Sequence, residues 1–224
     1  MFLDDRKKRI LQAIVDYYVN SAEPIASKML VSDYGLDVSS ATIRNEMAEM
    51  EEMGLLEKTH TSSGRIPSDL GYRYYVDDIM NVNDISNDEI AKFLDSVSNA
   101  NKDIIQSISM ALSGATHYTS ISSDDDGIFM YGRNNVFDHP EFNDIESIKK
   151  FMYLLEEEEI IREIFSKPHT DITVRIGKEN SLEQLKDYGL IIFSYQDKGD
   201  IAIVGPKRMD YGKVIAYIKH LLSE

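Results

Sequence analysis

Apolar residues recur every three or four positions in three successive segments at the start of the chain. Residues 5–20, 25–33 and 40–53 show this spacing, which is the period of an amphipathic helix. Gly35 follows the core of the second segment and Gly54 follows the third, and glycine is the residue most often found directly after a helix. We therefore predict three short helices in this part of the chain.

The pattern then changes from helical spacing to short extended runs. "LLEKT" predicts a strand, "HTSSGRIPSD" a turn-rich loop, and Ile66 the start of a return strand. "LGYRYYVDDIM" predicts a helix that leads out of this region. The order helix, helix, helix, strand, loop, strand is that of a winged helix-turn-helix, which we place in residues 1–80.

A capping box opens the second part of the chain. Ser86 is followed three residues later by Glu89, so each side chain can accept a hydrogen bond from the backbone N–H of the other. Apolar residues continue at helical spacing as far as Gly114. We predict one long helix over this stretch.

Short strands dominate the region after Gly114. "HYTSISSDDDGIFMYG" predicts two strands around an Asp-Gly turn, and "DITVRIG", "LIIFSY" and "IAIVG" predict three more. Further helices are predicted at residues 144–166 and 210–223. We therefore expect residues 81–224 to form an α+β domain with a mostly antiparallel sheet.

The third predicted helix separates an apolar face from a face suited to contact with DNA bases. Ile43, Met47 and Met50 fall on one side and predict a buried stripe. The opposite side carries Ala41, Asn45, Ala48 and Glu52. Small residues on either side of Asn45 let the helix approach the floor of a DNA groove, where an asparagine can bond both N6 and N7 of adenine.

Polar residues at the start of the same helix extend this surface. Arg44 lies on its flank, where the guanidinium can reach a guanine or a phosphate. Ser39, Ser40 and Thr42 offer hydroxyls to phosphates near the helix N-terminus, whose dipole favours anions. The acidic residues cluster in the C-terminal half, so we expect only the first two turns to enter a groove.

A second interpretation of this helix stays open on these residues alone. Arg44 can be a solvated surface charge and Asn45 merely exposed, because helix-turn-helix units also bind proteins. Ion pairs within a helix form between residues three or four apart. None of the residues at those distances from Arg44 is acidic, which favours a partner outside the helix.

The loop after the first predicted strand contains no acidic residue from Lys58 to Pro67, although the chain as a whole is acidic. Gly64 permits a positive φ at the tip, from which we expect Arg65 to project, and narrow minor grooves attract arginine. Other side chains compatible with phosphate contact are Lys58, His60, Thr61 and Ser62. We therefore predict that this loop is a wing that contacts DNA.

The segments "SATIRNEM", "HTSSGRIP" and "GYRYYVD" together closely resemble the N-terminal domain of the HrcA family, heat-inducible transcription repressors of bacteria. Later segments that also resemble the family are "ALSGATHYTSI", "FMYLLEEEE", "VRIGKEN" and "IAIVGPKRMDYGKVI". The resemblance implies a homodimer that binds double-stranded DNA at an inverted-repeat operator upstream of chaperone operons. It also implies a GAF-like second domain and a chaperonin that maintains the active form.

The chain departs from this family in its length. Family members are usually considerably longer, with a larger GAF-like core and an inserted dimerisation segment. Here "HYTSIS" leads through "SDDDG" almost directly to "IFMYGRNN", so we expect a reduced GAF-like domain whose dimer contacts lie elsewhere. Our candidates, all in the helix that begins after Ser86, are Ile90, Phe93, Val97, Ile104 and Ile108.

Composition and charge narrow the function further. The 224 residues carry a formal net charge of -15 with a pI near 4.7, which argues against non-specific affinity for nucleic acid. Residues 1–80 contain nine Lys and Arg against 14 Asp and Glu, so any DNA contact depends on where the charges lie. Cysteine, an apolar signal segment and a run long enough to span a bilayer are all missing, so we expect a cytoplasmic protein.

The sequence contains no arrangement typical of an enzyme or a metal site. It offers no nucleophile–base pair and no phosphate-binding loop, its histidines lack the spacing of metal ligands, and we expect no cofactor. The leading hypothesis is a dimeric, sequence-specific repressor of heat-shock chaperone operons. The alternative is a winged-helix regulator whose GAF-like domain senses a small-molecule ligand.

Overall fold

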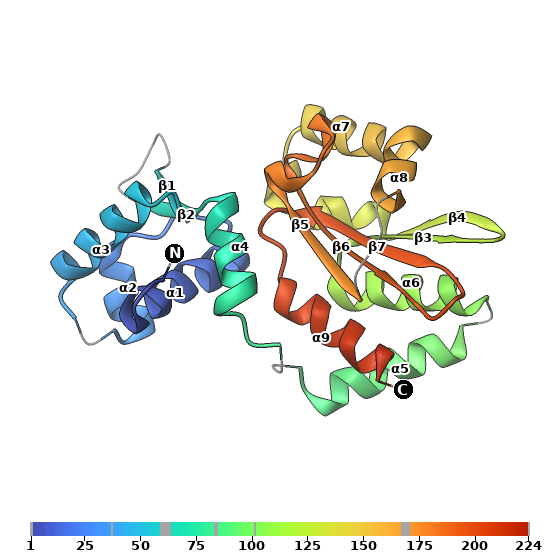
Figure 1. Ribbon diagram of the computed structural model, residues 1–224, viewed down its shortest axis with the longest axis horizontal. Coiled ribbons are helices and arrows are strands. Elements are labelled where there is room, and N and C mark those ends of the chain that lie inside the picture. The colour runs from blue at the N-terminus through green and yellow to red at the C-terminus, as the bar shows by residue number, and fades with distance from the viewer. Residues whose placement is uncertain are drawn as a thin grey trace. The chain divides into compact units, whose positions relative to one another are not determined.

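The computed structural model describes residues 2–36, 38–58, 64–82, 85–100, 102–166 and 171–223. The chain divides into two compact units, Met1–Asn81 and Val82–Glu224. Figure 1 shows that the first unit is mostly helical, whereas the second combines a sheet with helices. Among the described residues, no helix has both the length and the apolar character needed to cross a membrane.

The first unit follows the predicted order of elements. Its two strands pair antiparallel, with Glu57 opposite Ile66. In chain order the elements are α1 (Asp5–Ser21), α2 (Ser27–Tyr34), α3 (Ser40–Glu52), β1 (Leu56–Lys58), β2 (Arg65–Pro67) and α4 (Asp69–Asp78).

The apolar stripe predicted for the third helix, which is α3, is confirmed. Ile43, Met47 and Met50 are each at most 3% exposed, and both α1 and α2 pack against this helix. Burial of side chains of this size stabilises the fold by roughly 1.5–3 kcal/mol each. This packing fixes the direction in which the opposite face of α3 points.

Helix α4 lies very close to the segment that connects α3 to β1. Ser68 caps α4 by accepting a hydrogen bond from the N–H of Gly71, and its own N–H donates to the carbonyl oxygen of Leu55. A Cβ atom at Gly71 would lie 2.1 Å from that same carbonyl oxygen. Glycine at this position therefore allows α4 to hold the base of the β1–β2 hairpin.

The second unit is built on a five-stranded sheet with the order β4-β3-β7-β6-β5. Every neighbouring pair is antiparallel, which confirms the predicted α+β class. Its main elements are α5 (Asn87–Asn99), α6 (Ile104–Thr116), β3 (Thr119–Asp124), β4 (Gly127–Tyr131), α7 (Ile145–Glu156), α8 (Glu158–Phe165), β5 (Ile172–Ile176), β6 (Tyr188–Ser194), β7 (Asp200–Pro206) and α9 (Tyr211–Leu222).

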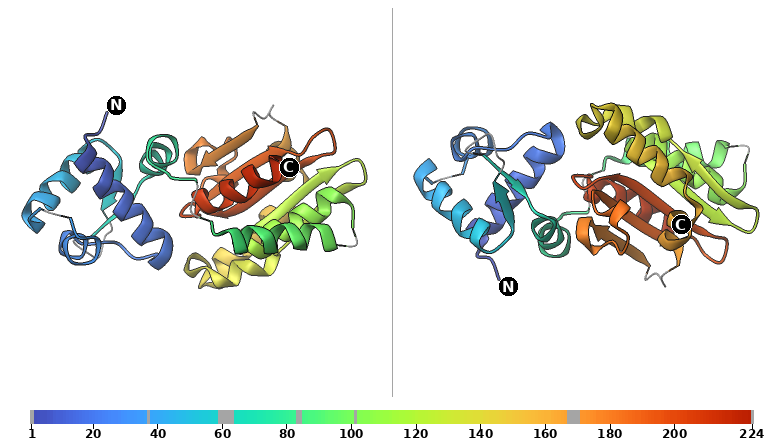
Figure 2. Two further views of the ribbon diagram at one scale, coloured as in Figure 1. Left: turned by 90° about the horizontal axis from the view of Figure 1, so that it is seen from below. Right: turned by 90° about the horizontal axis from the view of Figure 1, so that it is seen from above.

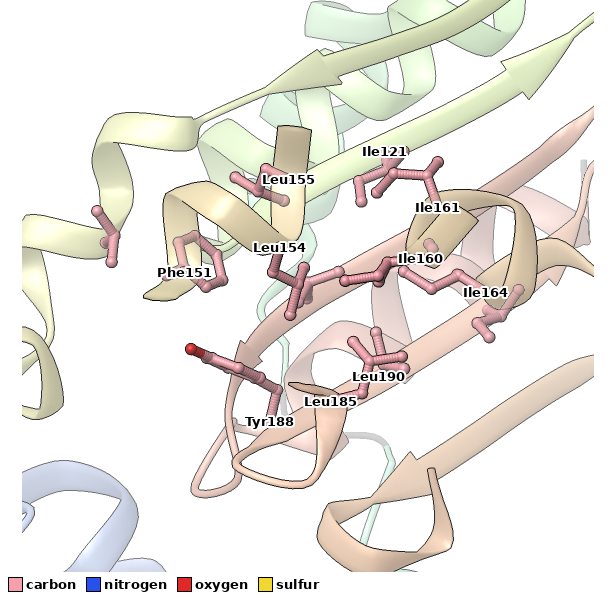
Figure 3. Packing of buried hydrophobic residues seen from close by; sticks show 14 of the residues in the cluster. Ile121, Phe151, Leu154, Leu155, Ile160, Ile161, Ile164, Leu185, Tyr188 and Leu190 are labelled. Atoms are coloured by element: carbon pink, nitrogen blue, oxygen red, sulfur yellow. The ribbon is translucent and has the colours of Figure 1, made fainter. Parts of the chain in front are cut away.

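Helices cover both faces of this sheet, as Figure 2 shows. α6 and α9 pack on one face with α5 against them, and α7 and α8 lie over the other face. Leu190 and Ile192 of β6 belong to the cluster under α7 and α8, where Figure 3 shows Phe151 and Ile161 pointing toward the strands. Ile191 is fully buried as well and, because strand side chains alternate, faces the α6 side.

The single long helix predicted after Ser86 is wrong, because the chain forms two helices there. The capping box of Ser86 and Glu89 opens α5 as predicted, but Ala100 adopts an extended conformation and ends the helix. Asp103 then caps α6 by accepting a backbone hydrogen bond. Short polar side chains such as this aspartate compete for backbone hydrogen bonds, and apolar spacing alone does not reveal the resulting break. The helix predicted at residues 144–166 is likewise divided, into α7 and α8.

Part of the apolar face expected to contact a second copy is used inside the second unit. Phe93, Val97 and Ile108 are at most 8% exposed. The ring of Phe93 packs against the ring of Tyr217 in α9, with 4.9 Å between the ring centroids. These three side chains therefore serve the unit's own core, as expected, and contact of this helix face with a second copy stays a prediction.

Candidate nucleic-acid interface

A groove of about 520 Å³ opens on the first unit between α2, α3 and the β1–β2 hairpin. The residues that line it are Ala26, Ser27, Lys28, Arg44, Met47, Lys58 and Arg65. Among the described residues of this lining, every charged side chain is cationic, and each comes from a different element. A concave surface lined by one sign of charge focuses the electrostatic potential and attracts ions of the opposite sign. The acidic chain thus contains a locally basic groove.

The N-terminus of α3 is closed by the hydroxyl groups that the sequence singled out. Ser39 is the N-cap residue, and its Oγ accepts a hydrogen bond from the N–H of Thr42 at 3.1 Å. The Ser39 and Thr42 hydroxyls also bond each other at 2.9 Å. Substituting such a cap residue typically costs about 1 kcal/mol, so Ser39 has a structural role in addition to any contact with a ligand.

The outward face of α3 carries the two residues predicted to contact bases. Arg44 and Asn45 are exposed, and so are Ala41 and Ala48 on either side of Asn45. Within the described residues, neither Arg44 nor Asn45 has an ion pair or a side-chain hydrogen bond. The structure therefore leaves both side chains available to a ligand at the groove.

Cations of α1 neutralise the acidic residues on the inner side of α3. The buried carboxylate of Glu46 lies 2.7 Å from Arg6 Nη2 and 2.7 Å from Lys7 Nζ. Lys7 Nζ also lies 3.0 Å from Glu49 Oε2. These carboxylates raise the pKa of Lys7 well above its usual value, chiefly through the hydrogen bond with Glu46. Lys7 therefore compensates the negative charge of α3 and is itself only 13% exposed at its side chain.

The expectation that Arg65 projects from the wing is wrong. Its Nε donates a hydrogen bond to Glu51 Oε2 at 2.6 Å, and its side chain is only 14% exposed. Gly64 packs so closely against Pro24 that a Cβ atom there would lie 2.8 Å from the Pro24 Cβ. Close packing therefore explains the glycine, and an ion pair with a residue 14 positions earlier holds the arginine.

The remaining predicted residues fall into two groups. Lys58 is exposed at the end of β1 and lines the groove, and Ser40 is half-buried in the first turn of α3. His60, Thr61 and Ser62 lie outside the described residues. The groove thus brings together Lys58 and Arg44 from separate segments of the sequence.

Lys28 is a charged groove residue that the sequence interpretation missed. It is exposed in the first turn of α2 and lines the groove together with Ala26 and Ser27. The available signal was its place in the first helix of a helix-turn-helix pair, since that helix crosses the DNA backbone in such motifs. Its position beside α3 could not be read from local spacing.

Comparison with known proteins places the chain in one family. The family model described as "HrcA protein C terminal domain" matches residues 78–215. A relative from Acetivibrio thermocellus, named heat-inducible transcription repressor HrcA, is 28% identical, and the alignment covers 100% of this chain and 95% of the relative. A relative of the same name from Carboxydothermus hydrogenoformans is 31% identical over 98% of this chain and 96% of the relative.

These alignments are longer than the chain itself. They extend over 335 and 327 positions, whereas the chain has 224 residues, so the relatives contain residues with no counterpart here. A solved structure described as a hypothetical protein at 2.2 Å resolution has a similar fold, with a TM-score of 0.78 and 18% identity over 99% of this chain and 97% of that chain. From the family model and the two relatives together, the chain belongs to the HrcA family, whose members are named heat-inducible transcription repressors.

Proposed function

We propose that this protein represses heat-shock chaperone genes by binding operator DNA in the basic groove of its first unit. The observation that carries the proposal is that Lys28, Arg44, Lys58 and Arg65 line one groove beside the exposed face of α3. In this proposal residues 1–80 act as a winged helix-turn-helix, in which α3 enters the major groove and the β1–β2 hairpin is the wing.

The groove residues then divide into two roles. Asn45 contacts a base edge from the exposed face of α3 opposite the core, and Arg44, exposed on the flank, reaches a guanine or a phosphate. Lys28 and Lys58 contact phosphates on either side, together with the hydroxyls near the helix N-terminus. His60, Thr61 and Ser62 extend the phosphate contacts on the evidence of the sequence alone.

Recognition of a promoter requires two copies of this surface. One recognition helix contacts only a few base pairs, and two helices related by a dyad match an inverted repeat. We therefore propose a homodimer in which residues 81–224 form a reduced GAF-like regulatory and dimerisation domain. A chaperonin that maintains the active form would then link repression to the folding state of the cell.

Hydroxyl-radical footprinting on promoter fragments upstream of the organism's own chaperone genes tests this proposal. We expect two protected segments on one face of the duplex, with centres about 10 base pairs or a multiple of that distance apart. The double variant Arg44→Ala, Lys58→Ala should lose the protection, whereas Glu52→Gln, at an exposed position on the same helix, should keep it. Uniform protection of all fragments, or none, would contradict the proposal.

A second groove favours a further candidate function, the sensing of a small ligand. It has a volume of about 370 Å³ and lies between α5, α6 and α9, where Phe93, Met110 and Tyr217 contribute to a mostly apolar lining. Ligand pockets typically measure roughly 300–1,000 Å³. A metabolite that changes operator affinity in the wild type but not in Met110→Trp, which narrows the groove, would support this function. Operator affinity that no metabolite alters would speak against it.

A further inference from the structure

Arg65 joins the wing to the segment before α2 through its backbone. Its N–H donates to the carbonyl oxygen of Ile25 at 3.0 Å, and its carbonyl oxygen accepts from the N–H of Ile25 at 3.1 Å. In the hairpin it stands opposite Lys58. The close packing of Gly64 on Pro24 brings the same two segments together. The base of the wing is therefore attached to the start of α2.

The side chain of Arg65 joins the wing to α3 as well. Glu51, its partner, lies in the last turn of α3, and the pair is partly buried, with 14% of the Arg65 side chain and 34% of the Glu51 side chain exposed. A cation near the C-terminus of a helix also interacts favourably with the helix dipole. Partial burial limits screening by salt, so this pair is held more firmly than a fully exposed one.

These contacts make one residue the junction of the elements that form the groove. The other groove cations are Lys28 of α2, Arg44 of α3 and Lys58 of β1. Arg65 bonds Ile25 just before α2, forms an ion pair with Glu51 of α3, and lies opposite Lys58 in the hairpin. The spacing of those cations therefore depends on the Arg65 contacts. The carboxylate of Glu51, 2.6 Å from the guanidinium, also cancels much of the attraction that Arg65 could exert on a phosphate.

We infer that Arg65 is a positioning residue, and that its ion pair with Glu51 sets the distance between wing and recognition helix on which base selectivity depends. This inference rests on the proposed DNA-binding function and specifies which contact fixes the distance between the hairpin and α3. It assigns a role to Glu51, an acidic residue of a DNA-binding helix that would otherwise only repel phosphates.

A charge swap in the full-length chain tests this inference. The variants are Glu51→Arg, Arg65→Glu and the double variant that carries both, with Glu52→Arg as the control that adds the same charge at an adjacent exposed position. The probes are a duplex with the footprinted promoter repeat and a shuffled duplex of the same composition. Three quantities are measured for each variant. The first is the specificity ratio, which is the Kd for the shuffled duplex divided by the Kd for the promoter repeat. The others are the salt dependence of binding and the melting temperature.

For a positioning role we expect each single variant of the pair to lower the specificity ratio by about tenfold or more, the size of coupling between residues in contact. The double variant should recover most of that ratio with the salt slope of the wild type. Glu52→Arg should tighten binding to both duplexes and leave the ratio unchanged. A folded double variant that stays unselective and whose salt slope falls by about one unit would show instead that Arg65 contacts a phosphate, and it would overturn the inference.

The variant Glu51→Gln keeps the inference testable if the swap does not fold. Loss of one negative charge strengthens binding to both duplexes in either case, so the specificity ratio decides. Positioning predicts a lower ratio than in the wild type, whereas a direct phosphate contact by Arg65 predicts tighter binding to both duplexes with an unchanged ratio, and this second result would overturn the inference. If the wild type itself shows no preference for the promoter repeat, the proposed function fails and the inference fails with it.

Discussion

Asn45 is an exposed amide between exposed alanines on the outer face of α3, and it is the residue that we propose contacts a base. We predict that Asn45→Ala lowers discrimination at one base position in each half-site by about 1–3 kcal/mol, because a bidentate contact with adenine is lost. Affinity for shuffled DNA should barely change. Fluorescence anisotropy with single-base operator variants measures this, and an equal loss on all sequences would make Asn45 a backbone contact.

Lys28 provides the contrasting case, because it lines the groove from α2 and lies outside the face of α3 that we propose contacts bases. We predict that Lys28→Ala weakens binding to every sequence to a similar extent and lowers the salt slope by about one unit, since one phosphate contact disappears. Titrations at several salt concentrations measure the slope. A slope equal to that of the wild type would place Lys28 outside the interface.

The position of a side chain in the site could be predicted from the sequence where the helical period alone determines it. The helical period placed Asn45 opposite the buried stripe of α3 and Arg44 on its flank, and both are exposed. The period could not place Arg65, because its partner Glu51 belongs to another element and the two meet only in the folded unit. Lys28 was missed for the same reason.

At the element scale, the strands and most helix boundaries followed from apolar spacing and turn residues, whereas breaks within helices did not. The spacing of α5 and α6 is nearly continuous, yet the extended conformation of Ala100 ends α5 and Asp103 caps the start of α6. The sequence also did not show which glycines inside helices are required by close packing. Gly71 and Gly114 both lie in helices, yet only Gly71 has a backbone atom within 4 Å of where a Cβ would stand.

This difference predicts opposite effects of the same substitution. Gly71→Ala places a methyl group against the carbonyl oxygen of Leu55 and should destabilise the first unit by about 1–3 kcal/mol. Gly114→Ala meets nothing within 4 Å and should stabilise α6 by up to about 1 kcal/mol. Urea unfolding followed by circular dichroism measures both changes. Destabilisation by both variants would contradict the packing described for α6.

At the scale of the whole molecule, the chain lacks residues that its relatives contain, while its second unit still forms a complete five-stranded sheet covered on both faces. Smaller domains bury a smaller fraction of their surface and are correspondingly less stable. We predict that dimerisation and operator binding are lost together when the second unit unfolds at heat-shock temperature, and that chaperonin restores both. Sedimentation and operator binding across a temperature ramp test this. A monomer that binds the operator fully would contradict it.

The central claim is that an acidic protein selects DNA through one basic groove in its first unit. The most direct test measures the Kd of the full-length chain for a shuffled duplex and divides it by the Kd for the promoter's inverted repeat, both at one fixed physiological salt concentration. We predict a ratio of about 10³ or more for the wild type, as in specific protein–DNA complexes, and a much smaller ratio for the double variant Arg44→Ala, Asn45→Ala. Equal affinity for the two duplexes, or a wild-type ratio in the double variant, would contradict it.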